Sequence, residues 1–405
     1  MADRRVAITG VGIICAAGPN VAEAWGSIQR GVSAIGPITA VDSSVMRFQN
    51  GAEVRNYDPF QYFEGSRADH LDRFAQFAVI AAREAVADAG ITFTPALQEN
   101  TAVVCGNGAG GQISQDSGYI DLYQRARNRV HPLIVPRTMA SGGVSHVTME
   151  FGIHGPSYAV STACSSSNHA IGQAFQMVRR GEVDLAITGG SEAPFALGCL
   201  KAWEAMRVIA PDTCRPFCVD RRGMILGEGA GIIVLEPLEA ARARGAQIYA
   251  ELAGFGMSAD AHHITQPTVE GPARAIRRAL ADANLAIEQI GYINAHGTAT
   301  PGNDPAETAA IREVFGPQAD RLAISSTKSM HGHALGAAGS IEAVITIMAL
   351  HEGTLPPTAN FTKADPACDL DYIPNKSRNL RAEAALSNSF AFGGLNAVLA
   401  FRAAK

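Results

Sequence analysis

The sequence lacks the features that mark several restricted classes of protein. It has no uncharged run of about 18 apolar residues, so we expect no membrane-spanning segment. Charged residues are only 18% of the chain and the net charge is −5, so no positive field attracts nucleic acid. Aromatic residues are also few, at 6%, but hydrophobic residues reach 47%, which excludes disorder, collagen and coiled coils.

The chain also lacks the cysteine spacing of a disulfide framework. Its seven cysteines are an odd number and are scattered, as expected of reduced thiols in a cytoplasmic protein. Cys214 and Cys218 lie far along the sequence from His331 and His333, and the sequence near these residues offers no further candidate metal ligand. We therefore expect neither a metal site nor a resident cofactor.

The N-terminus resembles a secretory signal only superficially. Arg4 and Arg5 precede an apolar stretch, residues 6–17, but Thr9 and two glycines interrupt it. Residues 6–10 (VAITG) are typical of a buried strand that ends in a glycine turn. We expect a first strand here and no cleaved signal.

Length and patterning predict an α/β protein with two similar halves. A chain of 405 residues exceeds one ordinary core. After the first strand, a helical pattern at 74–89 precedes a strand pattern at 101–105. The same order of strand, helix and strand recurs at 249–255, 273–283 and 292–295. We place the halves at residues 1–245 and 246–405, although no sequence repeat proves a duplication.

Cys164 is the first candidate catalytic residue. It follows a predicted strand, residues 157–160, and lies where a helix with the apolar residues Ile171, Phe175 and Val178 begins. Unpaired amide groups and the helix dipole at such a position favour a thiolate and can hold an oxyanion. A buried structural cysteine at a turn of small residues is the alternative that residue type alone favours.

Two further strand-end loops carry chemically capable residues. His296 follows a strand end, whereas Lys328 and His333 follow the strand predicted at 322–325, and Glu342 lies on the next helix. Taken singly, such histidines are usually structural and such a lysine is usually a solvated charge. Three loops of this kind in one α/β chain favour a common site, because α/β sites gather at strand ends.

Five segments together resemble the signatures of elongating β-ketoacyl-acyl-carrier-protein synthases, in the family's order and along essentially the whole chain. They are residues 161–166 (STACSS), 296–301 (HGTATP), 326–330 (STKSM), 332–339 (GHALGAAG) and 388–396 (NSFAFGGLN). The resemblance implies the thiolase-like fold, in which two duplicated α/β halves form a layered αβαβα architecture. It also implies a homodimer that works with an acyl carrier protein.

The resemblance further implies a role for each motif residue. Cys164 takes the acyl chain, and His296 and His333 hold the malonyl thioester oxygen during a decarboxylative Claisen condensation. The backbone N–H groups of Cys164 and Phe392 form the oxyanion hole, and Phe392 also gates the site. Lys328 pairs with Glu342 and organises the electrostatics, with a direct proton role as the alternative.

Three related classes fit the residues less well. Initiating synthases use cysteine, histidine and asparagine, whereas this chain carries two histidines. Thiolases use a second cysteine in the C-terminal half, where only Cys368 occurs, outside any glycine-rich motif. Chain-length-factor relatives lack the nucleophile, so Cys164 argues against a silent partner subunit.

The pathway stays open between primary fatty-acid elongation and a specialised route. Residues 201–207 (KAWEAMR) and His331 are similar to nodulation-type synthases. The alternative is therefore a ketosynthase of a nodulation-type, modified-lipid or type II polyketide pathway, which would form a heterodimer with a chain-length-factor-like partner.

The loop at 106–111 (GNGAGG) nominally matches a dinucleotide-binding motif, but residues 117–131 are polar and helix-like where a second strand is required. In the resembled family this loop borders the acyl tunnel, so Ala109 predicts a wide acyl pocket. Trp203 is a second pocket candidate, with ordinary core packing as the alternative. For docking an acidic carrier we select Lys201 and three arginines, Arg127, Arg129 and Arg207.

Overall fold

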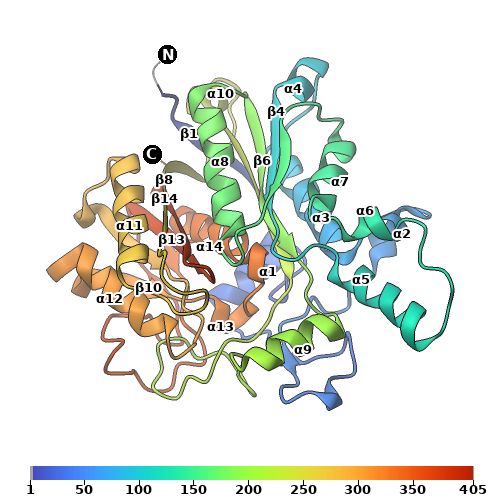
Figure 1. The fold of residues 1–405 in the computed structure, drawn as a ribbon. Helices are drawn as coiled ribbons and strands as arrows, with labels where there is room; N and C mark the ends of the chain where they lie inside the picture. Colours follow the sequence, from blue (N-terminus) through green and yellow to red (C-terminus); the bar gives the residue numbers. More distant parts are fainter. Residues whose placement is uncertain (1–2, 405) are drawn as a thin grey trace.

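A large mixed sheet organises the fold in the computed structural model, which describes residues 3–404 (Figure 1). It contains ten strands, in the order β10-β9-β13-β14-β8-β1-β7-β6-β4-β5. These strands are β1 Val6–Cys15, β4 Thr101–Gly106, β5 Ser157–Val160, β6 Leu185–Glu192, β7 Gly229–Pro237, β8 Ala250–Ala259, β9 Ile290–Asn294, β10 Ala323–Ser325, β13 Ala384–Ala391 and β14 Leu395–Ala403. Two short pairs lie apart from the sheet: β2 Gly36–Pro37 with β3 Asn50–Gly51, and β11 Thr354–Leu355 with β12 Arg378–Asn379.

The sheet contains the same strand arrangement twice. If the short pairs are left out, each half has five strands, which we number by their order along the chain within that half. From the outer edge of the sheet to the junction of the halves, the strands of both halves lie in the order third, second, fourth, fifth, first. In both, the second strand runs parallel to the third and fourth, and the fifth is antiparallel to the fourth and first. The halves join where β1 pairs antiparallel with β8, with Ile8 opposite Ala250.

Helices cover the outer faces and also separate the two halves. On the outside, α3 packs on β1 and β7, and α11 packs on β8 and β14. Between the halves, α8 contacts β6 and β14, α14 contacts β7 and β13, and the two helices contact each other. The α-helices of five or more residues are α1 Val21–Gln29, α3 Arg73–Asp88, α4 Pro95–Glu99, α5 Gln112–Tyr119, α6 Ile134–Thr138, α7 Gly142–Phe151, α8 Ser166–Arg180, α9 Leu197–Met206, α10 Leu238–Ala243, α11 Glu270–Ala283, α12 Asn303–Phe315 and α14 Ala338–Glu352; two single turns are α2 Arg67–His70 and α13 Lys328–His331.

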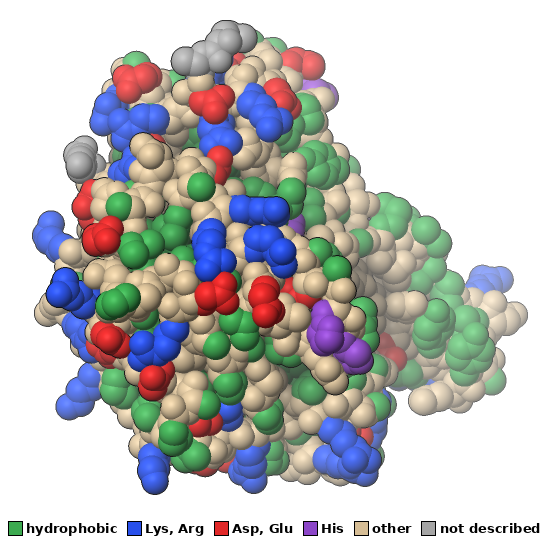
Figure 2. All heavy atoms as spheres, turned by 60° about the vertical axis from the view of Figure 1, so that its left-hand side comes forward, with side chains coloured by type: hydrophobic (Ala, Val, Ile, Leu, Met, Phe, Trp, Pro, Cys, Tyr) green, Lys and Arg blue, Asp and Glu red, His purple; other side chains and the backbone are tan. Residues whose placement is uncertain are grey.

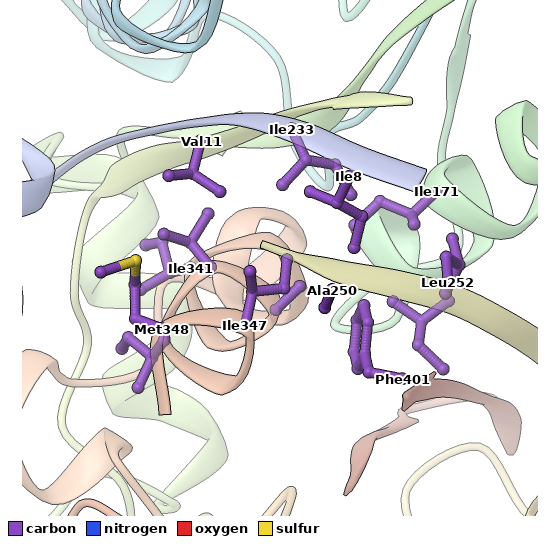
Figure 3. Packing of buried hydrophobic residues seen from close by; sticks show 14 of the residues in the cluster. Ile8, Val11, Ile171, Ile233, Ala250, Leu252, Ile341, Ile347, Met348 and Phe401 are labelled. Carbon is purple, nitrogen blue, oxygen red and sulfur yellow. The ribbon is translucent and has the colours of Figure 1, made fainter. Parts of the chain in front are cut away.

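The largest apolar cluster lies around these inner helices. Figure 3 shows Ile341 and Ile347 of α14 facing Ile8 and Ile233 of the strands above them, with Phe401 beside them. All five are at most 1% exposed. Residues 335–352 are long and apolar enough to cross a membrane, but 89% of this segment is buried inside the protein, so it serves as a core helix.

The layered, thiolase-like α/β fold expected from the sequence is confirmed. The expected elements are present with shifted ends: the first strand continues to Cys15, and the helix expected at 273–283 begins at Glu270. The helix expected within 117–131 is present only in its first part: α5 ends at Tyr119 and continues as a π-helical turn, Ile120–Gln124, and irregular chain follows from Arg125. The boundary near residue 246 lies between α10 and β8 and stays a prediction.

Candidate active site

A cavity of about 190 Å³ brings predicted site residues of both halves together. Cys164 reaches it from the N-terminal half, and His296, His333 and Phe392 reach it from the C-terminal half. Lys328 and Glu342 lie behind its wall and are fully buried. Other lining residues are Val208, Met224, Asp260, His263, Ile264, Thr265, Gln266, Pro267, Thr298, Thr300, Pro301, Gly302, Asn303, Phe390, Ala391, Gly394 and Asn396.

A tight turn places Cys164 directly before α8. Ala163 adopts a left-handed conformation with φ of 51°, which costs a non-glycine residue roughly 1–2 kcal/mol. Ser166 stabilises this turn, because its hydroxyl donates to Ala163 O at 2.6 Å and accepts from Thr162 N at 2.9 Å. The turn also needs Gly106 of β4, where a Cβ atom would lie 2.3 Å from Ser167 N. The serines after Cys164 therefore shape the nucleophile turn.

Burial opposes the thiolate that the position before a helix favours at Cys164. The side chain is 93% buried, and burial raises the pKa of the thiol to about 11. The positive charge of Lys328 and two backbone N–H groups lower the pKa, but they oppose burial only in part. The desolvation of Cys164 disfavours the thiolate more than the position before a helix favours it, so Cys164 is a thiol at neutral pH.

This pKa predicts how fast Cys164 reacts with iodoacetamide. Because the thiolate is the nucleophile, its alkylation rate should rise about tenfold per pH unit from pH 7 to 10 without levelling near pH 8.5. Peptide mass spectrometry on samples quenched at intervals measures this rate, and Cys164→Ala identifies the peptide signal. A plateau at or below pH 8.5 would contradict the raised pKa.

Two backbone N–H groups converge on the Cys164 sulfur. They belong to Cys164 itself and to Phe392, and each lowers the pKa of the thiol. Phe392 directly follows β13, which pairs with β9 and β14 in the middle of the C-terminal half. An oxygen on a carbonyl carbon bound to Cys164 would lie within reach of donors from both halves, as an oxyanion hole requires.

Hydrogen bonding fixes the tautomer of His333. Its Nδ1 accepts a hydrogen bond from Leu335 N at 3.1 Å, so the proton of the neutral ring resides on Nε2. The backbone of His333 is also held in place, because His333 N donates a hydrogen bond to Ile225 O at 2.7 Å. Nε2 of His333 is therefore a hydrogen-bond donor, as the stabilisation of a thioester oxygen needs.

His296 is held through its backbone. The Glu307 carboxylate of α12 accepts hydrogen bonds from His296 N and Gly297 N, both at 2.8 Å. The His296 ring lies 5.5 Å from the His333 ring, nearly perpendicular to it at 87°. Its Nδ1 is buried and has no hydrogen-bond partner among the described residues. The ring thus keeps its polar edge available to a substrate.

Both imidazoles are neutral at physiological pH. Burial lowers the pKa of His296 and His333 well below the usual value, and the positive charge of Lys328 lowers both further. A neighbouring imidazole lowers each pKa as well: His333 acts on His296, and His331 acts on His333. A neutral ring donates one hydrogen bond and has one acceptor nitrogen. In His333 that acceptor is already engaged by Leu335 N, whereas Nδ1 of His296 has no partner among the described residues.

Lys328 forms a fully buried ion pair with Glu342 of α14, as the resemblance implied. Burial raises the pKa of Glu342, and the charge of Lys328 opposes that rise. Lys328 also acts on Cys164, His296 and His333, so its charge reaches every proposed reacting side chain. This arrangement fits an electrostatic role.

Two buried carboxylates had no role predicted from the sequence. Glu307 positions His296, and Asn388 donates to it at 3.1 Å. Glu192, at the end of β6, accepts from Gly108 N at 2.7 Å and Gly336 N at 3.0 Å, joining loops of opposite halves. In the sequence, the only local indications are that Glu307 closely follows the motif at 296–301 and that Glu192 ends the segment GGSE, residues 189–192. Neither signal names the distant backbone that the acid binds.

The weaker candidates lie around the site. Of the described residues, neither Ala109 nor Trp203 lines the cavity, but the Trp203 ring stacks on Phe392. His331 is fully buried and its Nε2 lies 3.0 Å from Thr327 Oγ1. His263 is at the cavity mouth. Within residues 3–404, no group of three or more His, Cys, Asp or Glu side chains is arranged to hold a metal ion.

Comparisons with known proteins agree with this geometry. The N-terminal domain model of β-ketoacyl synthases matches residues 3–241, and the C-terminal domain model matches residues 249–362. The chain is 47% identical over 400 residues to nodulation protein E of Rhizobium sp. (strain N33), covering 99% of both chains. It is 40% identical over 407 residues to 3-oxoacyl-[acyl-carrier-protein] synthase 2 of Staphylococcus aureus (strain COL), covering 99% of this chain and 98% of that one.

A solved structure of similar shape is the ishigamide ketosynthase/chain length factor. It matches with a TM-score of 0.95 and 37% identity over the full length of both chains. The two family models together cover well over half of the chain, and the curated relatives exceed 30% identity across nearly all of it. This chain belongs to the β-ketoacyl synthase family.

Proposed function

We propose that the protein is a 3-oxoacyl-[acyl-carrier-protein] synthase that extends an acyl chain by two carbons. The observation that carries this proposal is the convergence, in one cavity, of the Cys164 thiol, two neutral imidazoles and two backbone N–H donors. A thiol nucleophile suits acyl transfer, and neutral donors suit the stabilisation of an enolate. We place Cys164 in one α/β half, residues 1–245, and the histidines and Lys328 in the other, residues 246–405.

In the first step, the Cys164 sulfur attacks the thioester carbonyl of an acyl carrier. The N–H groups of Cys164 and Phe392 stabilise the oxyanion, the bond to the carrier sulfur breaks, and the proton from Cys164 passes to that sulfur. Because Cys164 begins as a thiol, this proton needs an acceptor, and the neutral His296 ring, which lines the same cavity, has an Nδ1 with no partner among the described residues. The free carrier leaves, and acyl-Cys164 remains.

In the second step, malonyl carrier loses carbon dioxide. The electrons of the broken carbon–carbon bond form an enolate, whose oxygen accepts hydrogen bonds from His296 and His333. Its carbon attacks acyl-Cys164, a carbon–carbon bond forms, and the carbon–sulfur bond breaks. The departing Cys164 sulfur takes up a proton, which balances the reaction and releases a 3-oxoacyl carrier.

The test is incubation with acyl carrier and malonyl carrier, followed by mass spectrometry. We expect the mass of the acyl group on the Cys164 peptide, and carbon dioxide with a 3-oxoacyl carrier once malonyl carrier is added. A degradative thiolase would instead cleave acetoacetyl-coenzyme A in the presence of free coenzyme A. Absence of both the adduct and carbon dioxide release would overturn the proposal.

A second candidate is a specialised ketosynthase of a nodulation-type, modified-lipid or type II polyketide pathway. Its support is the 47% identity to a nodulation protein E, together with the buried His331, whose motif is similar to that group. A chain-length-factor-like subunit would then be the partner, by analogy with the ishigamide ketosynthase/chain length factor.

Ala109 supplies a prediction about chain length. It lies in the loop after β4, where its N–H donates to Glu192 at 3.2 Å, and its side chain is only one methyl group. If this loop borders the acyl pocket, Ala109→Ile should lower kcat/KM for long acyl donors by about 10-fold or more relative to short ones, through added bulk. Competition between short and long acyl carriers measures the ratio, with Ala109→Ser as the small control. An unchanged ratio would contradict this placement.

The acyl carrier, an acidic protein as a rule, would dock near the cavity mouth. Arg207 is the best placed candidate, because it is exposed at the end of α9 and precedes Val208, which lines the cavity. Arg127 pairs with Asp121, and Lys201 pairs with Glu204. These acidic partners reduce the attraction of Arg127 and Lys201 for an acidic carrier. Figure 2 shows acidic and basic side chains intermixed on the face that it presents, so we expect a local group of arginines to supply the attraction.

We also propose that the protein forms a dimer in the cytoplasm, either with itself or with a related subunit. β5 is the last strand of the sheet, and its outer edge has no strand partner within residues 3–404. Large apolar side chains on β5 and on α7, which contacts it, are exposed, including Tyr158 at 40% and Met149 at 63%. An uncovered strand edge beside apolar surface is a common dimer contact.

A further inference from the structure

The loop between β9 and α12, residues 295–302, runs from the interior of the cavity to its mouth, and we call it the mouth loop. Thr298 is buried, Thr300 is half-buried and Pro301 is exposed, and all three line the cavity. The hydroxyl oxygens of Thr298 and Thr300 lie 2.9 Å apart. Cys164 lines the same cavity and is only 7% exposed, so a thioester that another protein carries has to reach it on an extended arm. Such an arm passes the mouth loop.

The backbone of the mouth loop has a conformation that needs support. Ala299 is fully buried and has a left-handed φ of 63°, which is unfavourable for a residue with a Cβ atom. Its N–H donates to the Asp304 carboxylate at 3.1 Å, and its carbonyl accepts from Gly223 N at 3.0 Å. The same carboxylate accepts from Phe217 N at 2.7 Å, and Phe217 also has a left-handed φ, 63°. Groups from both halves of the chain therefore hold this strained loop.

Arg221, from the N-terminal half, binds the carbonyl side of the mouth loop. Its Nε donates to Thr300 O at 3.2 Å, and its Nη2 donates to Pro301 O at 3.4 Å. Its Nη1 donates to Cys218 O at 2.9 Å and also pairs with the Asp365 carboxylate. Arginine suits this position, because its planar fork donates to several oxygens in a fixed geometry. Arg221 thus fixes the backbone at Thr300 and Pro301.

This support lies behind the cavity wall. Within residues 3–404, Arg221 is not part of the cavity lining, whereas Thr300 and Pro301 are. The Arg221 side chain is 7% exposed, and Asp365 balances its charge. A buried guanidinium is costly unless its donors are satisfied, so Arg221 and the loop carbonyls hold one another in a single geometry. Removal of the guanidinium frees the backbone at Thr300 and Pro301 to shift.

We propose that Arg221 is a positioning residue that holds Thr300 and Pro301 in the shape that admits the arm of a carrier-bound substrate. It does not touch the reacting atoms, and it acts through the mouth loop. The inference rests on the proposed condensing function, since it requires a thioester that a carrier delivers. Loss of Arg221 should therefore slow the delivery of carrier-bound thioesters and leave the chemistry of a small thioester at Cys164 intact.

Two acyl donors separate delivery from chemistry. One is an acyl carrier, and the other is the S-ethyl thioester of the same acid, which has no arm. Arg221→Met should slow adduct formation on Cys164 from the acyl carrier by about 10- to 100-fold, because a misplacement of about 1 Å in a positioning group costs up to that much. The rate with the ethyl thioester should be unchanged. Mass spectrometry of the Cys164 peptide at intervals measures both rates.

Arg312→Met is the matched control. Arg312 of α12 also bonds an aspartate and a backbone carbonyl, at 2.7 Å to the Asp369 carboxylate and 3.3 Å to Asp369 O, but neither group belongs to the mouth loop. This variant should change neither rate. Arg221→Lys keeps the charge without the planar fork, so it should recover part of the rate with the acyl carrier even if Arg221→Met folds poorly.

A double-variant cycle tests whether Arg221 acts through the mouth loop. Thr300→Val removes the hydroxyl that Arg221 positions, so in this background Arg221→Met should cost less with the acyl carrier, by about 2-fold or more. Equal losses with the acyl carrier and the ethyl thioester, or full additivity with Thr300→Val, would overturn the inference alone. Absence of any adduct on Cys164 in the unaltered protein would instead overturn the proposed function.

Discussion

Cys164→Ala enzyme is expected to lose condensation by about 10⁴- to 10⁶-fold, the loss that follows removal of a catalytic nucleophile. Decarboxylation of malonyl carrier should continue in the same variant. The reason is geometric, because the donors for the enolate are on His296 and His333, and neither ring is held by Cys164. Radiolabelled malonyl carrier separates the two activities, since carbon dioxide and the 3-oxoacyl product are measured independently.

His333→Ala provides the reciprocal variant. It keeps the nucleophile and both N–H donors at the sulfur, so the acyl adduct on Cys164 should still form. Decarboxylation should fall by about 10²- to 10³-fold, the usual effect of losing one donor to a developing oxyanion. His351→Ala, an exposed histidine at the end of α14, is the matched control and should change neither activity. Loss of decarboxylation in Cys164→Ala and its retention in His333→Ala would contradict this division of roles.

The sequence predicted the fold and the main side chains because both leave local signals. Period-two and helical apolar patterns located most elements, and the strand-end positions of Cys164, His296 and His333 indicated that they meet. The structure brings all three to one cavity. The repeated strand order was not visible in the sequence, because it depends on which strands pair across the sheet.

Quantities set by the surroundings could not be read from the sequence. A cysteine before a helix favours a thiolate, but the structure leaves Cys164 7% exposed, and burial dominates its pKa. The roles of Glu192 and Glu307 likewise depend on backbone groups elsewhere in the chain. The contact of Trp203 with Phe392 joins residues 189 positions apart, so no local pattern encodes it.

Lys328→Met is expected to destabilise the fold by about 3–5 kcal/mol, because it leaves the Glu342 carboxylate buried without its partner. Glu342 is 0% exposed, and its Oε2 already has no hydrogen-bond partner among the described residues. Urea unfolding at fixed protein concentration measures the change. Arg277→Met breaks the exposed pair with Glu313 and should cost less than about 1 kcal/mol.

The same variant should also become less stable as pH rises. Burial raises the pKa of Glu342 above its value in the unfolded chain, about 4.3, and without Lys328 nothing comparable opposes the rise. Between the two pKa values the folded protein holds a proton that the unfolded chain releases, so stability falls by about 1.4 kcal/mol per pH unit. Lys328→Met/Glu342→Leu removes both charges and should recover most of the stability without this added slope. A Lys328→Met enzyme that is as stable as Arg277→Met, with no added pH slope, would show that the pair does not hold the site together.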